Sequence, residues 1–152
     1  MARYLATITT QRPAEETFAY LSTFSNAADW DPGVLSAQQL DPGPVQRGTR
    51  FRLVVPFLGR QLTMSYEVIL LVPGIEVVLT AASRLLRATD RILVTADGAG
   101  AMVSYEAEVV LRGPLRLLDI LLRPEFNTVG DRAAAGLAQA LAAAASPPPA
   151  RS

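Results

Sequence analysis

The sequence predicts an α+β fold in which an antiparallel sheet packs against a long C-terminal helix. Between residues 34 and 112, strand-like runs follow one another with short, turn-rich connections. Short connections join antiparallel neighbours, because parallel strands need a long crossover. After residue 113 the apolar side chains recur at helical spacing instead. With one more strand at the N-terminus, the pattern predicts a seven-stranded sheet.

The first 33 residues predict one strand and two short helices. Residues 3–9 alternate apolar and polar side chains with the period of a strand. Pro13 suits the first position of a helix, because its missing N–H would be unpaired there, and this helix is expected at residues 13–22. Ser25 is expected to cap a second, shorter helical turn, which ends at residues 30–33.

Six further strands follow, each ended by turn residues. They are expected at residues 34–40, 49–57, 61–72, 75–81, 85–96 and 101–112. The leucine-rich stretch 115–122 is expected to form a helix that packs against the sheet. Pro124 should kink or split that helix, since proline disfavours helical geometry in the residue before it. A long helix should then begin at Glu125.

The chain as a whole is expected to be a single domain at residues 1–145, followed by a disordered, proline-rich tail at residues 146–152. The N-terminus lacks the continuous apolar run of a signal peptide. The longest uncharged stretch, residues 133–150, is too weakly apolar for a membrane span. We therefore expect a cytoplasmic protein.

The composition excludes several kinds of site. The chain has no cysteine and no histidine, which excludes disulfides, thiol nucleophiles, imidazole acid–base catalysis and zinc sites built on those ligands. Fourteen basic and fourteen acidic residues balance, which argues against nucleic acid as a partner. Any catalysis must depend on carboxylates, tyrosines, arginines or backbone groups. We expect no metal and no cofactor.

The order of a strand, two short helices, six strands and a long helix resembles the helix-grip fold of the START-like (SRPBCC) superfamily. Its polyketide cyclase/dehydrase and lipid-transport group is the most similar. The likeness covers residues 4–141 and is carried by the segments Arg12–Leu21, Ala28–Gly33, Gly48–Phe51, Asp97–Gly100 and Leu111–Asp119. These segments are specific to the fold and not to a reaction, and no catalytic motif matches residue by residue.

The resemblance implies a cavity between the concave face of the sheet and the long helix, with Trp30 near its rim. Strand parity predicts which side chains face that cavity, because alternate side chains point to opposite faces. The predicted inward residues are positions 51, 53 and 55 in the strand expected at residues 49–57. In the three longer strands they are every second residue from 62 to 72, from 86 to 94 and from 103 to 111. The candidate ligand-binding residues are Trp30, Phe51, Leu53, Met64, Tyr66, Asp90, Ile92, Tyr105, Phe126 and Val129.

Three polar side chains are predicted to face this interior: Tyr66, Tyr105 and Asp90. Binding sites are mostly apolar, with a few polar groups that fix the ligand's orientation. Each residue also has a structural interpretation. The tyrosines would bond within the core, and Asp90 would point to solvent or cap a backbone group at a bulge. Trp30 would fill the core. Asp90 is the only catalytic candidate.

Three functional hypotheses follow. The first is a carrier or sensor that binds a small hydrophobic ligand, such as a lipid, a quinone or a polyketide-like molecule. The second is a polyketide cyclase or dehydratase that uses the same cavity. The third is a protein-interaction module with a collapsed cavity. Outward apolar residues such as Val54, Ile69 and Leu71 suggest a hydrophobic patch and hence a homodimer.

Overall fold

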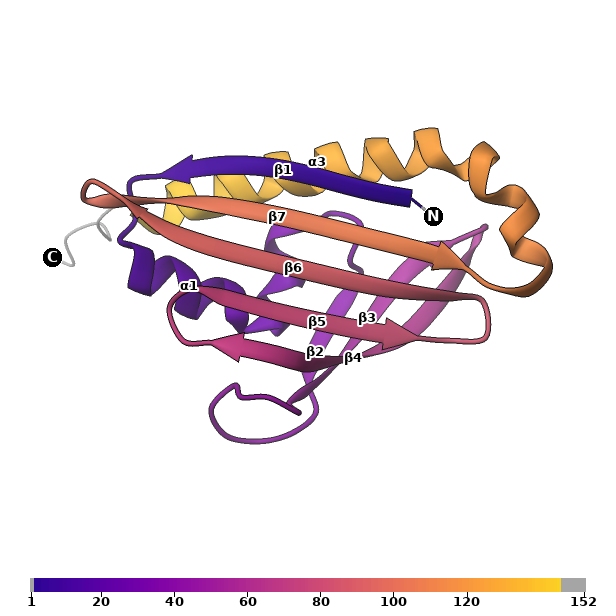
Figure 1. Ribbon diagram of the computed structural model, residues 1–152, viewed down its shortest axis with the longest axis horizontal. Coiled ribbons are helices and arrows are strands. Elements are labelled where there is room, and N and C mark those ends of the chain that lie inside the picture. The colour runs from indigo at the N-terminus through magenta and orange to yellow at the C-terminus, as the bar shows by residue number, and fades with distance from the viewer. Residues whose placement is uncertain (1, 146–152) are drawn as a thin grey trace, which may run out of the picture.

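The computed structural model describes residues 2–145, and side chains up to residue 142. Seven antiparallel strands form one curved sheet in the order β1-β7-β6-β5-β4-β3-β2, and the long helix α3 packs along it beside β1 (Figure 1). This arrangement confirms the predicted helix-grip fold. The strands are β1 (Ala2–Thr10), β2 (Ser36–Gln39), β3 (Arg50–Phe57), β4 (Arg60–Val72), β5 (Glu76–Ala82), β6 (Leu86–Asp97) and β7 (Gly100–Leu111).

The segment between β1 and β2 forms the predicted short helices. Helix α1 (Ala14–Ser22) begins directly after Pro13. A 3-10 turn, η1 (Phe24–Asn26), then leads into α2 (Ala27–Trp30). The expected Ser25 cap is wrong, because the 3-10 turn moves the start of α2 to Ala27, and no side chain caps that start. Strand β2 is also shorter than expected, and the loop before it lies close to the interior.

A β-bulge in β4 inverts the predicted parity of that strand. The register with β5 shifts between Val68 and Leu70, so Ile69 is the extra residue. After the bulge, the positions predicted to face the core face solvent, and the positions predicted to face solvent face the core. Leu70 and Val72, predicted to face inward, are 40% and 37% exposed, whereas Leu71 packs against the core. Leu71 therefore does not belong to an outward hydrophobic patch.

The C-terminal segment differs from the prediction in its first turns. It begins as a 3-10 helix, η2 (Gly113–Leu118), and continues as α3 (Asp119–Ala145). Pro124 lies inside α3 and does not split it, although Figure 1 shows the helix changing direction in its first turns. These turns lie beyond the ends of the strands, so the expected packing on the sheet is wrong for half of the six apolar side chains, whereas Leu115 and Leu122 do pack against the core. The exposed ones are Leu117, Ile120 and Leu121.

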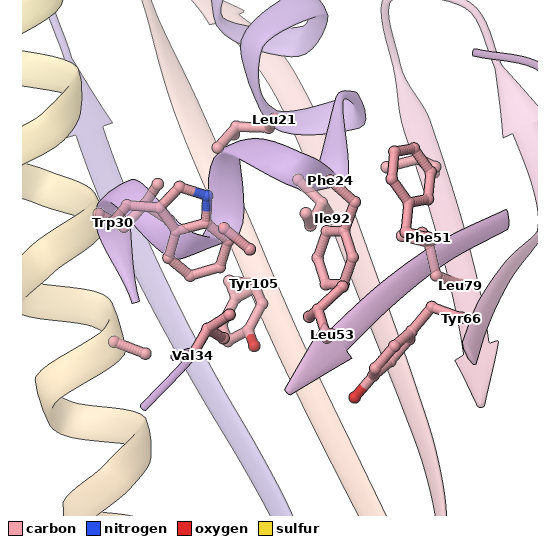
Figure 2. Close-up of a cluster of buried hydrophobic side chains, with 14 of the residues drawn as sticks. Leu21, Phe24, Trp30, Val34, Phe51, Leu53, Tyr66, Leu79, Ile92 and Tyr105 are labelled. Carbon is pink, nitrogen blue, oxygen red and sulfur yellow. The ribbon is translucent and has the colours of Figure 1, made fainter. Parts of the chain in front are cut away.

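Two glycines let α3 approach the rest of the molecule closely. A Cβ at Gly136 would collide with the backbone carbonyl oxygen of Trp30, and a Cβ at Gly130 would collide with the ring of Tyr4. The approach completes a core on the inner face of the sheet, part of which Figure 2 shows. The helix therefore lies close over the sheet at its C-terminal half.

Candidate functional site

An internal cavity of about 270 Å³ lies between the inner face of the sheet and α3. A water molecule needs only roughly 10–15 Å³, so the volume of this cavity is much larger than that of a packing defect. The sheet contributes side chains from β3, β4, β6 and β7, and the loop after α2 contributes a third wall. The β3–β4 turn and the first turns of α3 supply the remaining lining. Most of the lining is apolar, as is typical of ligand sites.

Asp90 and Tyr105 form a buried polar pair in this cavity. Asp90 pairs in register with Ala107, and Tyr105 pairs with Ile92, so Asp90 and Tyr105 are diagonal neighbours on β6 and β7. Long side chains reach across such a diagonal, and the Tyr105 hydroxyl donates a hydrogen bond of 3.3 Å to Asp90 Oδ2. Asp90 is 7% exposed and Tyr105 is 5% exposed. A carboxylate is therefore held inside an apolar space.

Asp31 brings a second carboxylate to the same cavity from the loop that follows α2. Its Oδ1 accepts a hydrogen bond of 2.8 Å from the backbone N–H of Gly33, and its backbone N–H donates to the carbonyl oxygen of Ala27 at 2.8 Å. The first bond is a local Asx-type turn. The loop is thereby fixed with the Asp31 carboxylate at the cavity wall.

Burial changes the protonation of these groups. Desolvation, followed by the nearby charge of Asp31, raises the pKa of Asp90 from its ordinary 3.8 to about 7, and the hydrogen bond from Tyr105 opposes this rise. Desolvation also raises the pKa of Asp31, against the bond from Gly33. The pKa of Tyr105 lies well above its ordinary value because of burial and the Asp90 charge. Near neutral pH, Asp90 is thus partly protonated while Tyr105 stays protonated.

Tyr66 adds a third polar group. It lies on β4 opposite Phe51, and its ring packs on Phe24 with centroids 5.3 Å apart. Tyr66 is 7% exposed and lines the cavity, yet its hydroxyl has no hydrogen-bond partner within residues 2–145. In Figure 2 the hydroxyls of Tyr66 and Tyr105 both point away from Leu21. The Tyr66 hydroxyl is thus an unused polar group at the cavity wall.

Comparison with known families identifies the chain. The family model described as "Polyketide cyclase / dehydrase and lipid transport" matches residues 1–144, which is nearly the whole sequence. The protein belongs to this family. A search of curated proteins gives no significant match.

Solved structures share the fold of this polyketide cyclase/dehydrase family member at low sequence identity. A protein from Thermus thermophilus has a TM-score of 0.75 at 18% identity, over 95% of this chain and 99% of that one. A START superfamily protein from Mycobacterium smegmatis has 0.74 at 14% identity, over 93% and 97%. The Zhui aromatase/cyclase from Streptomyces sp. R1128 has 0.67 at 17% identity, over 94% and 97%. These similarities establish the fold alone.

The structure gathers seven of the ten candidate ligand-binding residues at the cavity of this family member. They are Leu53, Met64, Tyr66, Asp90, Tyr105, Phe126 and Val129. The other three, Trp30, Phe51 and Ile92, are outside the lining and at most 2% exposed. The expected rim position of Trp30 is wrong, because its indole packs behind Tyr105 at 5.6 Å between ring centroids. Which of the seven touch a ligand stays a prediction.

Several lining residues lie outside the ten candidate ligand-binding residues, although strand parity had placed two of them, Ala88 and Ala107, on the inward face. Asp31 is the most important, and its sequence signal is the Asp-Pro-Gly turn directly after Trp30. Small residues on the inward face of β6 and β7, Ala88 and Ala107, leave the space that the larger neighbours surround. Within residues 2–145 no group of three or more acidic side chains could hold a metal ion. No described helix is both long and apolar enough to span a bilayer.

Proposed function

We propose that this protein binds a small hydrophobic ligand, of the lipid, quinone or polyketide-like kind, inside the cavity and acts as its carrier or sensor. The observation that supports the proposal most directly is the apolar cavity of about 270 Å³ with a few polar groups placed in its wall. The family description includes lipid transport. A collapsed interior, on which the protein-interaction hypothesis depends, is not what the structure has.

The lining supports ligand binding because it offers apolar contact area and a few polar groups that can orient the ligand. Leucine, valine, methionine and phenylalanine side chains supply apolar contact area, and burial of such area is worth about 25 cal/mol per Å². Asp90, Tyr105 and Tyr66 offer polar contacts at one side. A ligand is thereby held by its apolar part and oriented by its polar part.

A second candidate function is a cyclase or dehydratase, and one observation favours it. Burial raises the pKa of Asp90 to about 7, which is the range in which a general acid or base works best near neutral pH. The Tyr105 hydroxyl lies 3.3 Å from Asp90 Oδ2 and would hold this carboxylate in place. Under this candidate, Asp90→Asn abolishes turnover of a β-keto substrate but leaves its binding intact. Recovery of the bound molecule chemically unchanged after long incubation contradicts it.

The binding proposal is tested by filling the cavity. Ala107 faces the cavity from β7, so Ala107→Phe is expected to occupy part of the space and to abolish saturable binding of the neutral probe N-phenyl-1-naphthylamine, measured by its fluorescence. Glu108→Phe is the matched control, because it adds the same side chain to the other face of the same strand.

The two variants decide between outcomes. Circular dichroism melts should show that both variants fold, and the control should bind the probe as the unmodified protein does. Native mass spectrometry of the freshly purified protein should also reveal a retained small molecule. If the unmodified protein and Ala107→Phe take up the probe equally, or neither takes it up, the cavity is not a binding site and the proposal is refuted.

A further inference from the structure

The charged residues that line the cavity are all acidic. Asp31, Asp90, Asp119 and Glu125 belong to the lining, and no arginine does. The chain contains no lysine or histidine at all. Asp119, in the first turn of α3, is paired with Arg123 at 2.9 Å between Oδ2 and Nη2. The negative charge of the inner wall therefore has no basic residue of the lining to balance it.

The two inner carboxylates keep unused acceptor positions. Neither Asp31 nor Asp90 forms an ion pair within the described part of the chain. Asp90 accepts one hydrogen bond, from Tyr105, and Asp31 accepts one, from the Gly33 backbone. An ionised carboxylate offers about four acceptor sites, so most of them are unfilled.

An independent observation points to a ligand at the same place. Tyr66 is 7% exposed and lines the cavity, and its hydroxyl has no partner within residues 2–145. Its oxygen is a further acceptor. Because Tyr66 lines the cavity, a bound molecule can supply the hydrogen bond that the protein does not.

We propose that the natural ligand is a hydrophobic amine, an apolar molecule with one protonated amino group that Asp90, Asp31 and the Tyr66 hydroxyl bind. This inference rests on the proposed function and names the chemical class of its ligand. An ammonium group has three N–H donors and no acceptor. It therefore matches the three acceptors Asp90, Asp31 and Tyr66 in a cavity wall that contains no positively charged side chain. The apolar part of the ligand then lies against the leucine and valine side chains of the sheet.

The same wall disfavours anions. A fatty-acid carboxylate placed beside Asp90 and Asp31 meets like charge in a space of low polarity, where repulsion is screened least. A neutral alcohol satisfies the hydroxyl of Tyr66 but leaves both carboxylates without a counter-charge. Desolvation by burial raises the pKa of both Asp90 and Asp31, and no basic residue of the lining opposes this rise. The expected order of affinity is amine, then alcohol, then acid.

The test is a series of three probes with one shape. The probes are 2-(2-naphthyl)ethylamine, 2-(2-naphthyl)ethanol and 2-naphthylacetate, and calorimetry measures their binding at pH 7.5. We expect the amine to bind at least about tenfold more tightly than the alcohol, since hydrogen bonds to charged groups exceed neutral ones by this order. The acetate should bind more weakly than the alcohol.

Variants assign the selectivity to the named carboxylates. Asp90→Asn is expected to lower the amine's affinity about tenfold and to leave the alcohol's unchanged. Asp97→Asn, at the exposed end of the same strand, is the matched control and should change neither. Asp31→Asn gives the same comparison from the loop after α2 if Asp90→Asn, in β6, does not fold.

The outcomes separate this inference from the proposed function. If the alcohol or the acetate binds as tightly as the amine, the charge inference is refuted while the cavity remains a binding site. If the amine binds best but Asp90→Asn and Asp31→Asn leave its preference intact, the named residues are wrong. If none of the three probes nor the neutral fluorescent probe binds, both the inference and the proposed function are refuted.

Discussion

The free protein is expected to lose stability as the pH rises from 5 to 8, and Asp90→Asn is expected to remove most of that loss. Burial raises the pKa of Asp90 from 3.8 to about 7 in the folded protein. Between these values the folded state holds a proton that the unfolded state has released. The contribution of Asp90 to the free energy of unfolding is therefore largest below pH 4, falls through neutral pH and levels off above the folded pKa.

The magnitude follows from the size of the pKa change. The pKa of Asp90 is about three pH units higher in the folded than in the unfolded protein. This difference corresponds to about 4 kcal/mol of the free energy of unfolding over the whole pH range, because each unit is worth about 1.4 kcal/mol. Between pH 5 and pH 8 about 2–3 kcal/mol of this remains to be lost. For a chain of 152 residues, this is a decrease of roughly 5–10 °C in the melting temperature. The raised pKa of Asp31 acts in the same direction.

Urea denaturation at several pH values measures this change. Trp30 is the only tryptophan and is buried, so its fluorescence reports the loss of the core. The lowered pKa values of Asp41 and Asp119 affect stability only below about pH 4, outside the window. Asp90→Asn should be more stable than the unmodified protein at pH 8, and Asp97→Asn should keep the full slope. Equal stability at pH 5 and pH 8 in the unmodified protein would refute the reasoning.

Three further variants test the packing. Gly136→Ala should lower the free energy of unfolding by about 1–3 kcal/mol despite alanine's better helix propensity, because the methyl group meets the Trp30 carbonyl; unchanged stability in urea would contradict this close approach. Ile92→Ala, in the fully buried centre of β6, should cost about 2–5 kcal/mol in the same assay, and a loss below about 1 kcal/mol would speak against its place in the core. Leu71→Asp should destabilise by at least about 1 kcal/mol more than Leu70→Asp, and the reverse order would show that the bulge is absent.

Strand parity predicted much of the cavity wall. In β3, β6 and β7 the expected inward residues are the ones that line the cavity or fill the core, Leu53 and Asp90 among them. Alternation suffices there because these strands are regular. In β4 it fails after Val68, since the extra residue Ile69 shifts every later side chain to the other face. The sequence of that strand contains no glycine or proline to mark the bulge.

Residues in loops and at strand ends were harder to predict. Asp31 has the sequence context of a turn, and only the docking of its loop against the sheet places it at the cavity that Asp90 also lines. Trp30 precedes the same turn, yet its indole fills the core. The side chains of Leu117 and Ile120 have the spacing of a packed helix, but the sheet ends before it reaches them. Positions of this kind depend on which elements meet in space.

The sequence by itself determined the order of strands and helices, the absence of imidazole and thiol chemistry, and the polar residues on the inward face of β6 and β7, because these depend on residue type and on a local period of two or 3.6. Only the tertiary structure decided that a cavity remains between sheet and helix and that Asp31, Asp90 and Tyr66 meet in it. How α3 crosses the sheet sets the distance between groups far apart along the chain and the volume left between them. No local sequence pattern encodes that crossing.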